Sequence, residues 1–69
     1  MELKAVNAGN LRGIGYDAAR RVLRVNLNGT LIEYWAVSED TFRRLASSSA
    51  MWSFFRDNIE DQYSEQRVR

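Results

Sequence analysis

The Asn-Gly pair at Asn28 and Gly29 is the feature that most constrains how this chain can fold. Alternating apolar residues precede and follow it, and an Asn-Gly pair between two such segments predicts a β-hairpin with a type I′ turn. A two-residue turn at this point fixes which residues face each other across the two strands. The expected pairs are Leu27 with Thr30, Val25 with Ile32, Leu23 with Tyr34, and Val22 with Trp35.

The register of this hairpin separates an apolar face from a mixed face. Successive side chains of a strand point to opposite sides of a sheet, so the residues on the apolar face are Leu23, Val25, Ile32 and Tyr34. We expect this face to line the core. The mixed face consists of Val22, Arg24, Leu31, Glu33 and Trp35. With Val22, Leu31 and Trp35, this face is more apolar than is usual for a face in contact with water.

Helix signals follow the hairpin. Ser38 begins a predicted helix over residues 39–47, which has two carboxylates in its first turn, where they interact favourably with the helix dipole. The serines at 47–49 interrupt this helix, and Ser49 is suited to cap a second one. The second helix places Met51, Phe55 and Ile59 along one side.

Two further strands are predicted ahead of the hairpin, at residues 2–6 and 11–16, with a polar break between them. Strands first and helices after are typical of an α+β fold. The sequence therefore predicts a small antiparallel β-sheet of three or four strands, including the central hairpin, followed by two C-terminal helices packed on one face. Residues 1–69 are expected to form a single domain, with residues 64–69 as a frayed tail.

The chain contains neither histidine nor cysteine. These residues are the usual ligands of zinc, copper and iron, and histidine is the usual general base at neutral pH. Each carboxylate also has a structural explanation, at a turn, at a helix start or on a polar helix face. We therefore expect no catalysis, no metal site and no cofactor.

Charge and hydropathy limit the kinds of partner. Ten Lys and Arg residues stand against nine Asp and Glu, and the formal charge of +1 gives no attraction of the whole chain to nucleic acid. No segment is apolar over the length that a bilayer requires, and the first residues lack the pattern of a signal peptide. We expect a cytoplasmic protein without a membrane contact.

The mixed face of the hairpin suggests a protein contact. Val22, Leu31 and Trp35 form an apolar stripe rimmed by charge, which is typical of an interface with another protein or with a second copy of the chain. The simpler alternative is that another part of the chain covers this stripe within the monomer.

The same face also suggests a second kind of partner. Arg20, Arg21 and Arg24 lie on or beside it, and cations next to the Trp35 ring suit RNA or another single-stranded nucleic acid. The simpler alternative is that Arg24 pairs with Glu33. Taken together, the residues predict a small non-enzymatic interaction module, with protein contact or self-association favoured over RNA binding.

Most of the chain carries a recognisable set of motifs. They are the run from Leu11 to Asp17, then Leu23, Val25, Asn28, Gly29, Tyr34, Val37, Phe54, Phe55, Ile59 and Tyr63. This pattern, over residues 10–63, resembles the KTSC domain, a family named for the C-terminal extension of some lysyl-tRNA synthetases that also occurs as small bacterial and phage proteins. The resemblance implies the α+β fold and suggests RNA binding, but no defined activity.

The chain departs from the family pattern at several positions. Ile32 stands where the family has the first tyrosine of a Tyr-x-Tyr motif, Arg56 stands for an asparagine, Trp52 for a glycine and Ser38 for a proline. The basic Tyr-Pro-Tyr-Arg ending of the family is replaced here by residues 63–67. The lost tyrosine and the lost basic ending weaken the suggestion of RNA binding. They move the expected binding surface to Trp35 and its arginine neighbours.

Overall fold

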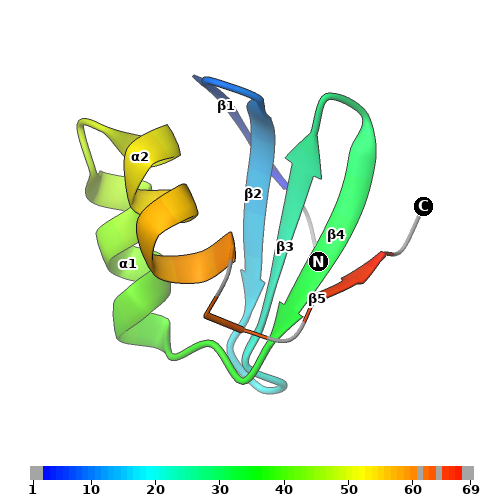
Figure 1. The fold of residues 1–69 in the computed structure, drawn as a ribbon. Helices are drawn as coiled ribbons and strands as arrows, with labels where there is room; N and C mark the ends of the chain where they lie inside the picture. The colour runs from blue at the N-terminus through cyan, green and yellow to red at the C-terminus, as the bar shows by residue number, and fades with distance from the viewer. Residues whose placement is uncertain (1–2, 61, 64, 68–69) are drawn as a thin grey trace.

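An antiparallel sheet with helices on one face makes up this computed structural model, which describes residues 3–60, 62–63 and 65–67 (Figure 1). In chain order the elements are β1 (Lys4–Ala8), β2 (Leu11–Asp17), β3 (Val22–Leu27), β4 (Thr30–Trp35), α1 (Glu39–Ser47), α2 (Met51–Phe55), the π-helix η1 (Arg56–Glu60) and β5 (Glu65–Arg67). The strands are hydrogen-bonded in the order β1-β2-β3-β4-β5, and every pair is antiparallel. The predicted α+β class is confirmed.

The hairpin of β3 and β4 has the predicted register. Leu27 faces Thr30, Val25 faces Ile32, Leu23 faces Tyr34 and Val22 faces Trp35. Asn28 and Gly29 have φ angles of 53° and 98°, which is the positive-φ pair that a type I′ turn requires. The side chain of Asn26 also accepts a hydrogen bond of 2.6 Å from the Gly29 N–H.

The core lies between the sheet and the helices. Its buried residues are Leu11, Ile14, Leu23, Val25, Ile32, Tyr34, Val37, Leu45, Phe55 and Ile59. All four residues predicted for the apolar face of the hairpin are among them. Phe55 meets Tyr34 edge-on, with ring centroids 5.6 Å apart, and so joins the helical layer to the sheet. Phe54 is half-buried and packs against the same cluster.

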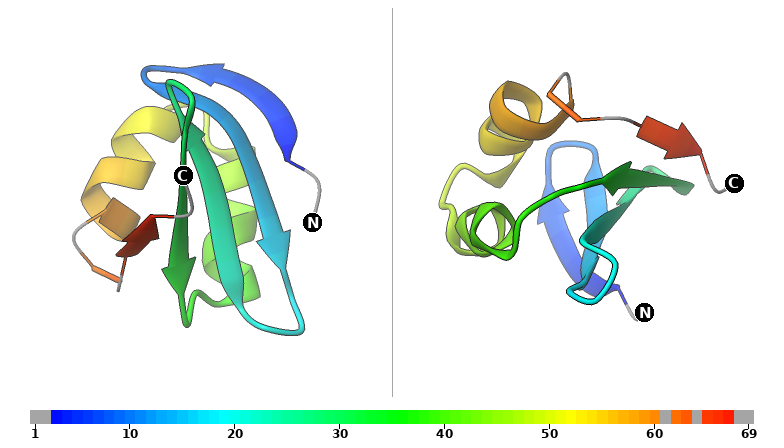
Figure 2. Two further views of the ribbon diagram at one scale, coloured as in Figure 1. Left: turned by 90° about the vertical axis from the view of Figure 1, so that its right-hand side faces the viewer. Right: turned by 90° about the horizontal axis from the view of Figure 1, so that it is seen from below.

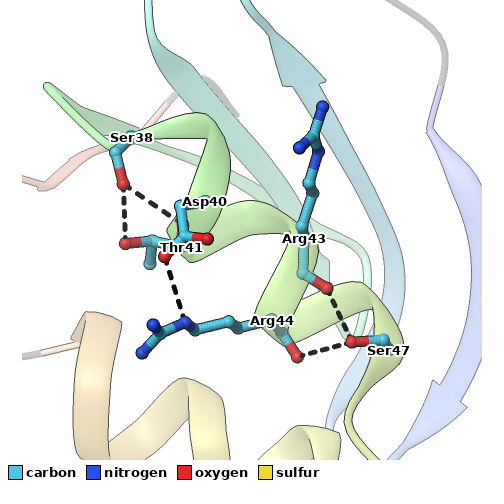
Figure 3. A network of polar contacts seen from close by, with 6 residues as sticks. All are labelled: Ser38, Asp40, Thr41, Arg43, Arg44 and Ser47. Atoms are coloured by element: carbon cyan, nitrogen blue, oxygen red, sulfur yellow. Dashed lines mark hydrogen bonds and ion pairs between the residues drawn. The ribbon is translucent and has the colours of Figure 1, made fainter.

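The first helix has the predicted bounds and the predicted cap. The Ser38 hydroxyl accepts a hydrogen bond of 3.1 Å from the Thr41 N–H (Figure 3). The second helix begins differently, because its N-cap is Ala50 and not Ser49. Ala50 donates its own N–H to the Ser48 hydroxyl over 3.1 Å, so Ser48 stabilises the turn before the helix. The helix then widens into η1 at Arg56.

The two ends of the chain differ from the predictions. The first strand is Lys4–Ala8, later than the expected 2–6, and Glu2 lies outside the described residues. Residues 64–69 were expected to fray, but Glu65–Arg67 form β5 and pair with β4 (Figure 2). The remaining tail positions, 64, 68 and 69, are not described. The open β4 edge offers N–H and C=O groups to an extended segment, and the Tyr34 hydroxyl also donates a hydrogen bond of 3.0 Å to the Glu65 carboxylate.

Candidate interaction surface

Two connections meet at one end of the sheet, at the lower end in Figure 1. One is the turn between β2 and β3, and the other joins β4 to α1. Val37 links them, because its N–H donates a hydrogen bond of 2.9 Å to the Arg21 carbonyl. The Val37 carbonyl in turn accepts a hydrogen bond of 2.5 Å from the Tyr16 hydroxyl. Both connections are therefore fixed to the same buried residue.

The backbone of these connections adopts conformations that side chains usually avoid. Arg21 and Ala36 have φ angles of 56° and 62°. Left-handed backbone at a residue with a Cβ is unfavourable and persists only where the surroundings enforce it. Part of that enforcement comes from Asp17, whose Oδ1 accepts hydrogen bonds of 3.1 Å from the Ala19 N–H and 3.3 Å from the Arg20 N–H. The turn is thus held in one shape.

Tyr16 stabilises this end from the core side. Its ring stacks on Phe42 of α1, with centroids 5.1 Å apart and planes 11° apart. Burial raises the pKa of the Tyr16 hydroxyl; Glu39 and Asp17 raise it further, and Arg21 opposes them. The phenol therefore keeps its proton at neutral pH and acts as the donor to Val37.

Trp35 is the exposed feature of this end of the sheet. Its side chain is 42% exposed, and it is the one large hydrophobic residue that is exposed in the part of the chain that the structure describes. The Arg20 guanidinium carbon lies over the indole, 5.6 Å from the ring centroid, within the range of a cation–π interaction. We call the surface of Arg20, Arg21, Trp35 and Ala36, all exposed, the Trp35 corner.

The predicted apolar stripe is smaller than the sequence suggested. Val22 is fully buried, so its assignment to an exposed binding surface is wrong. It lies on the inner strand β3, opposite Asp17 on β2 and Trp35 on β4, and side chains on both sides enclose a residue of this size. Leu31 is half-buried. Trp35 is therefore the residue of the stripe that offers a ring to a partner.

Arg24 is occupied by its neighbour on the next strand. Its Nε and Nη2 atoms lie 3.1 and 2.5 Å from the same Glu33 oxygen. The side chains of Arg24 and Glu33 are only 27% and 9% exposed. The pair was the simpler alternative for Arg24, and the structure shows it. Since the two charges cancel and face each other, Arg24 is not part of the exposed corner.

The remaining cations divide into paired and unpaired groups. On α1, Arg43 pairs with Glu39 and Arg44 pairs with Asp40, each over 3.0 Å (Figure 3 shows the second pair). In contrast, no carboxylate of the described residues lies within 4.0 Å of Arg20 or Arg21. Among the described residues, the two cations of the Trp35 corner thus form no ion pair, and the same holds for Lys4, Arg12 and Arg56.

Sequence reasoning named Arg20, Arg21 and Trp35 but did not bring them together in this way. It placed Trp35 beside Arg24 because both lie on the mixed face of the hairpin. The structure instead stacks Arg20 on Trp35 from the neighbouring turn. The positive φ of Arg21 directs this turn, and no sequence signal marks an arginine for that conformation.

The described residues contain no group of three or more His, Cys, Asp or Glu side chains that could hold a metal ion. Within the same part of the chain, no helix has both the length and the apolar character needed to cross a membrane.

Comparison with known proteins agrees with the motifs. The model of the KTSC domain family matches residues 7–63. The fold is also that of a KTSC domain protein from Yersinia pestis, whose crystal structure superimposes with a TM-score of 0.93 at 20% sequence identity and covers 99% of this chain and 97% of that one. No curated protein matches the sequence.

Proposed function

The chain belongs to the KTSC domain family, and we propose that it is a small non-enzymatic interaction module that contacts a protein partner through the Trp35 corner. The observation that carries this proposal is the 42% exposure of Trp35 in a molecule whose other large hydrophobic residues, among those described, are buried or half-buried. A tryptophan exposed beside arginines has the composition of an interface anchor.

The shape of the backbone supports the same proposal. Arg21 and Ala36 flank Val22 and Trp35, and both hold a left-handed conformation. Each such residue costs about 1–3 kcal/mol, a cost that concentrates at functional sites. The hydrogen bonds of Val37 to Arg21 and Tyr16 keep the corner in place before a partner arrives. A preformed surface loses less entropy on binding.

Single-stranded nucleic acid is the second candidate partner. One observation favours it: an exposed aromatic ring lies next to a guanidinium, and single-stranded nucleic acids bind where aromatic rings and cations occur together. The formal charge of +1 for the whole chain weighs against it, because binding to a phosphate backbone depends on several cations.

The proposal is tested with a photo-crosslinking amino acid in place of Ala36, an exposed neighbour of Trp35, introduced in cells that make the full chain. A matched control carries the same amino acid in place of Ser53, which is exposed on α2. We expect a protein adduct from position 36 and not from position 53. An adduct of twice the chain mass identifies self-association, and an adduct that nuclease removes supports the nucleic-acid alternative. Equal labelling at both positions, or none, contradicts the proposal.

A further inference from the structure

We infer that the partner of the Trp35 corner is an acidic protein segment, with carboxylates flanking an apolar side chain. This inference rests on the proposed function and adds the chemistry of the partner to it. The apolar side chain would meet the exposed edge of Trp35, and the carboxylates would meet Arg20 and Arg21.

The position of Arg20 over the exposed ring of Trp35, with the exposed Arg21 next to it in the chain, supports an acidic partner. Arg24 is bonded to Glu33, Arg43 to Glu39 and Arg44 to Asp40. These pairs neutralise the mixed face and the surface of α1. Arg20 and Arg21 form no ion pair with the described residues, although Asp17 is only a few residues away, because the Asp17 carboxylate accepts backbone N–H groups of the turn. Arg20 thus lies over the exposed ring, and Arg21, also exposed, follows it in the chain.

The stacking of Arg20 prepares it for a carboxylate. The guanidinium carbon of Arg20 lies 5.6 Å from the centroid of the indole, so the ring occupies one side of the group and its other sides keep N–H donors for a partner. The ring restricts the arginine to one orientation, so less entropy is lost when a carboxylate accepts two of these donors. Stacking and ion pairing therefore use different parts of the same group and are compatible.

A nucleic acid fits the charges of this corner less well. Proteins that bind the phosphate backbone neutralise several phosphates, and the Trp35 corner as the structure describes it holds two arginines, of which Arg20 lies over the ring. Arg24, a further cation on this face, forms an ion pair with Glu33, which neutralises its charge. A short acidic segment needs only the two cations that are present.

The experiment measures fluorescence anisotropy of three labelled probes against the full chain at low salt. The first is a twelve-residue peptide with two leucines flanked by glutamates, the second is the same peptide with glutamines, and the third is decauridylate. The key variant is the double change Arg20→Gln with Arg21→Gln. The matched control is Arg43→Gln with Arg44→Gln, which alters the formal charge equally on α1.

We expect the acidic peptide to bind most tightly, and the double change at 20 and 21 to weaken it about fivefold to tenfold, as two exposed ion pairs predict. The control pair should change binding less than about twofold. Equal losses from both double variants, no binding of the acidic peptide, or tighter binding of decauridylate overturns the inference. If the glutamine peptide binds equally well and Trp35→Ala abolishes this binding, the partner chemistry is wrong while the proposed function stands. If Trp35→Ala leaves the binding of every probe unchanged, the binding does not involve Trp35. That result contradicts both the inference and the proposed function.

Discussion

The two tryptophans of this chain lie in opposite environments. Trp52 is half-buried, stacks on Phe55 with ring centroids 5.8 Å apart, and lies against Gly9. Trp35 is 42% exposed and meets the guanidinium of Arg20. The difference teaches that the same residue type serves folding at one site and is available for binding at the other. The Trp52 ring occupies the space that Gly9 leaves by having no side chain.

The largest effect is expected from Gly9→Ala. A Cβ at this position would lie 2.4 Å from Cγ of Trp52, and the residue has a φ of +56°. The ring is packed and cannot move freely, so the clash and the backbone strain together should lower the free energy of unfolding by about 3 kcal/mol. Urea denaturation measures this as a lower midpoint with an unchanged slope.

Gly29→Ala is the matched control for backbone strain alone. Gly29 has a φ of +98°, and no atom lies within 4 Å of an added Cβ. It should cost about 1 kcal/mol. In a Trp52→Ala background, Gly9→Ala should lose its clash and fall to the same level. Equal losses at Gly9 and Gly29 in the native background would show that Trp52 does not depend on the space at Gly9.

The second prediction compares the tryptophans directly. Trp52→Ala should lower the free energy of unfolding by about 2–3 kcal/mol, because it removes contacts with Phe55 and leaves a gap beside the core. Trp35→Ala should cost less than about 1 kcal/mol, because much of the ring is already in water. Thermal unfolding of both variants tests this. A larger loss at Trp35 would make that residue a structural one and remove the basis for the proposed interface.

Much of this fold was predictable because its signals are local. Asn28 and Gly29 determine the turn, the turn determines the register of β3 and β4, and Ser38 determines where α1 begins. The fifth strand was not predictable from side chains. Its residues Glu65–Arg67 are polar, and they pair with β4 through backbone groups that every sequence possesses.

The candidate site was only partly predictable from the sequence. Trp35 followed from the hairpin register, since the outward face of β4 is set by counting from the turn. The burial of Val22 and the stacking of Arg20 depend on how the sheet twists and how the β2–β3 turn bends back. Both are tertiary properties that strand alternation does not contain.

A third prediction concerns Tyr16, which fixes the Trp35 corner to the core. Tyr16→Phe should cost about 1 kcal/mol at neutral pH, because the Val37 carbonyl loses its donor. The raised pKa of the Tyr16 hydroxyl means that the folded protein keeps this proton to higher pH than the unfolded chain. The stabilisation is therefore complete below the unfolded pKa of about 10 and is lost as the pH rises through the folded value.

Urea midpoints from pH 7 to 11 test this directly. The native chain should lose stability above pH 10 more steeply than the Tyr16→Phe variant, and the difference between the two curves isolates the Tyr16 hydroxyl from the other tyrosines. Parallel curves for the two proteins would mean that the Tyr16 hydroxyl does not donate to Val37 in solution. Of the two hydrogen bonds that fix Val37 at this end of the sheet, only the one to the Arg21 carbonyl would then remain.

The smallest effect on stability is expected from Arg20→Ala, and it bears most directly on the difference between the two tryptophans. An exposed cation–π pair contributes about 0.5–1 kcal/mol, so the unfolding midpoint should hardly move.

The fluorescence of Trp35 should change in the Arg20→Ala variant, because the guanidinium over its ring is replaced by water. Subtracting spectra of matched Trp35→Phe variants removes the signal of Trp52. Arg43→Ala, an exposed arginine on α1, should leave the subtracted spectrum unchanged. If Arg20→Ala also leaves it unchanged, the stack does not exist in solution, and Arg20 then has no fixed orientation in which to meet a carboxylate.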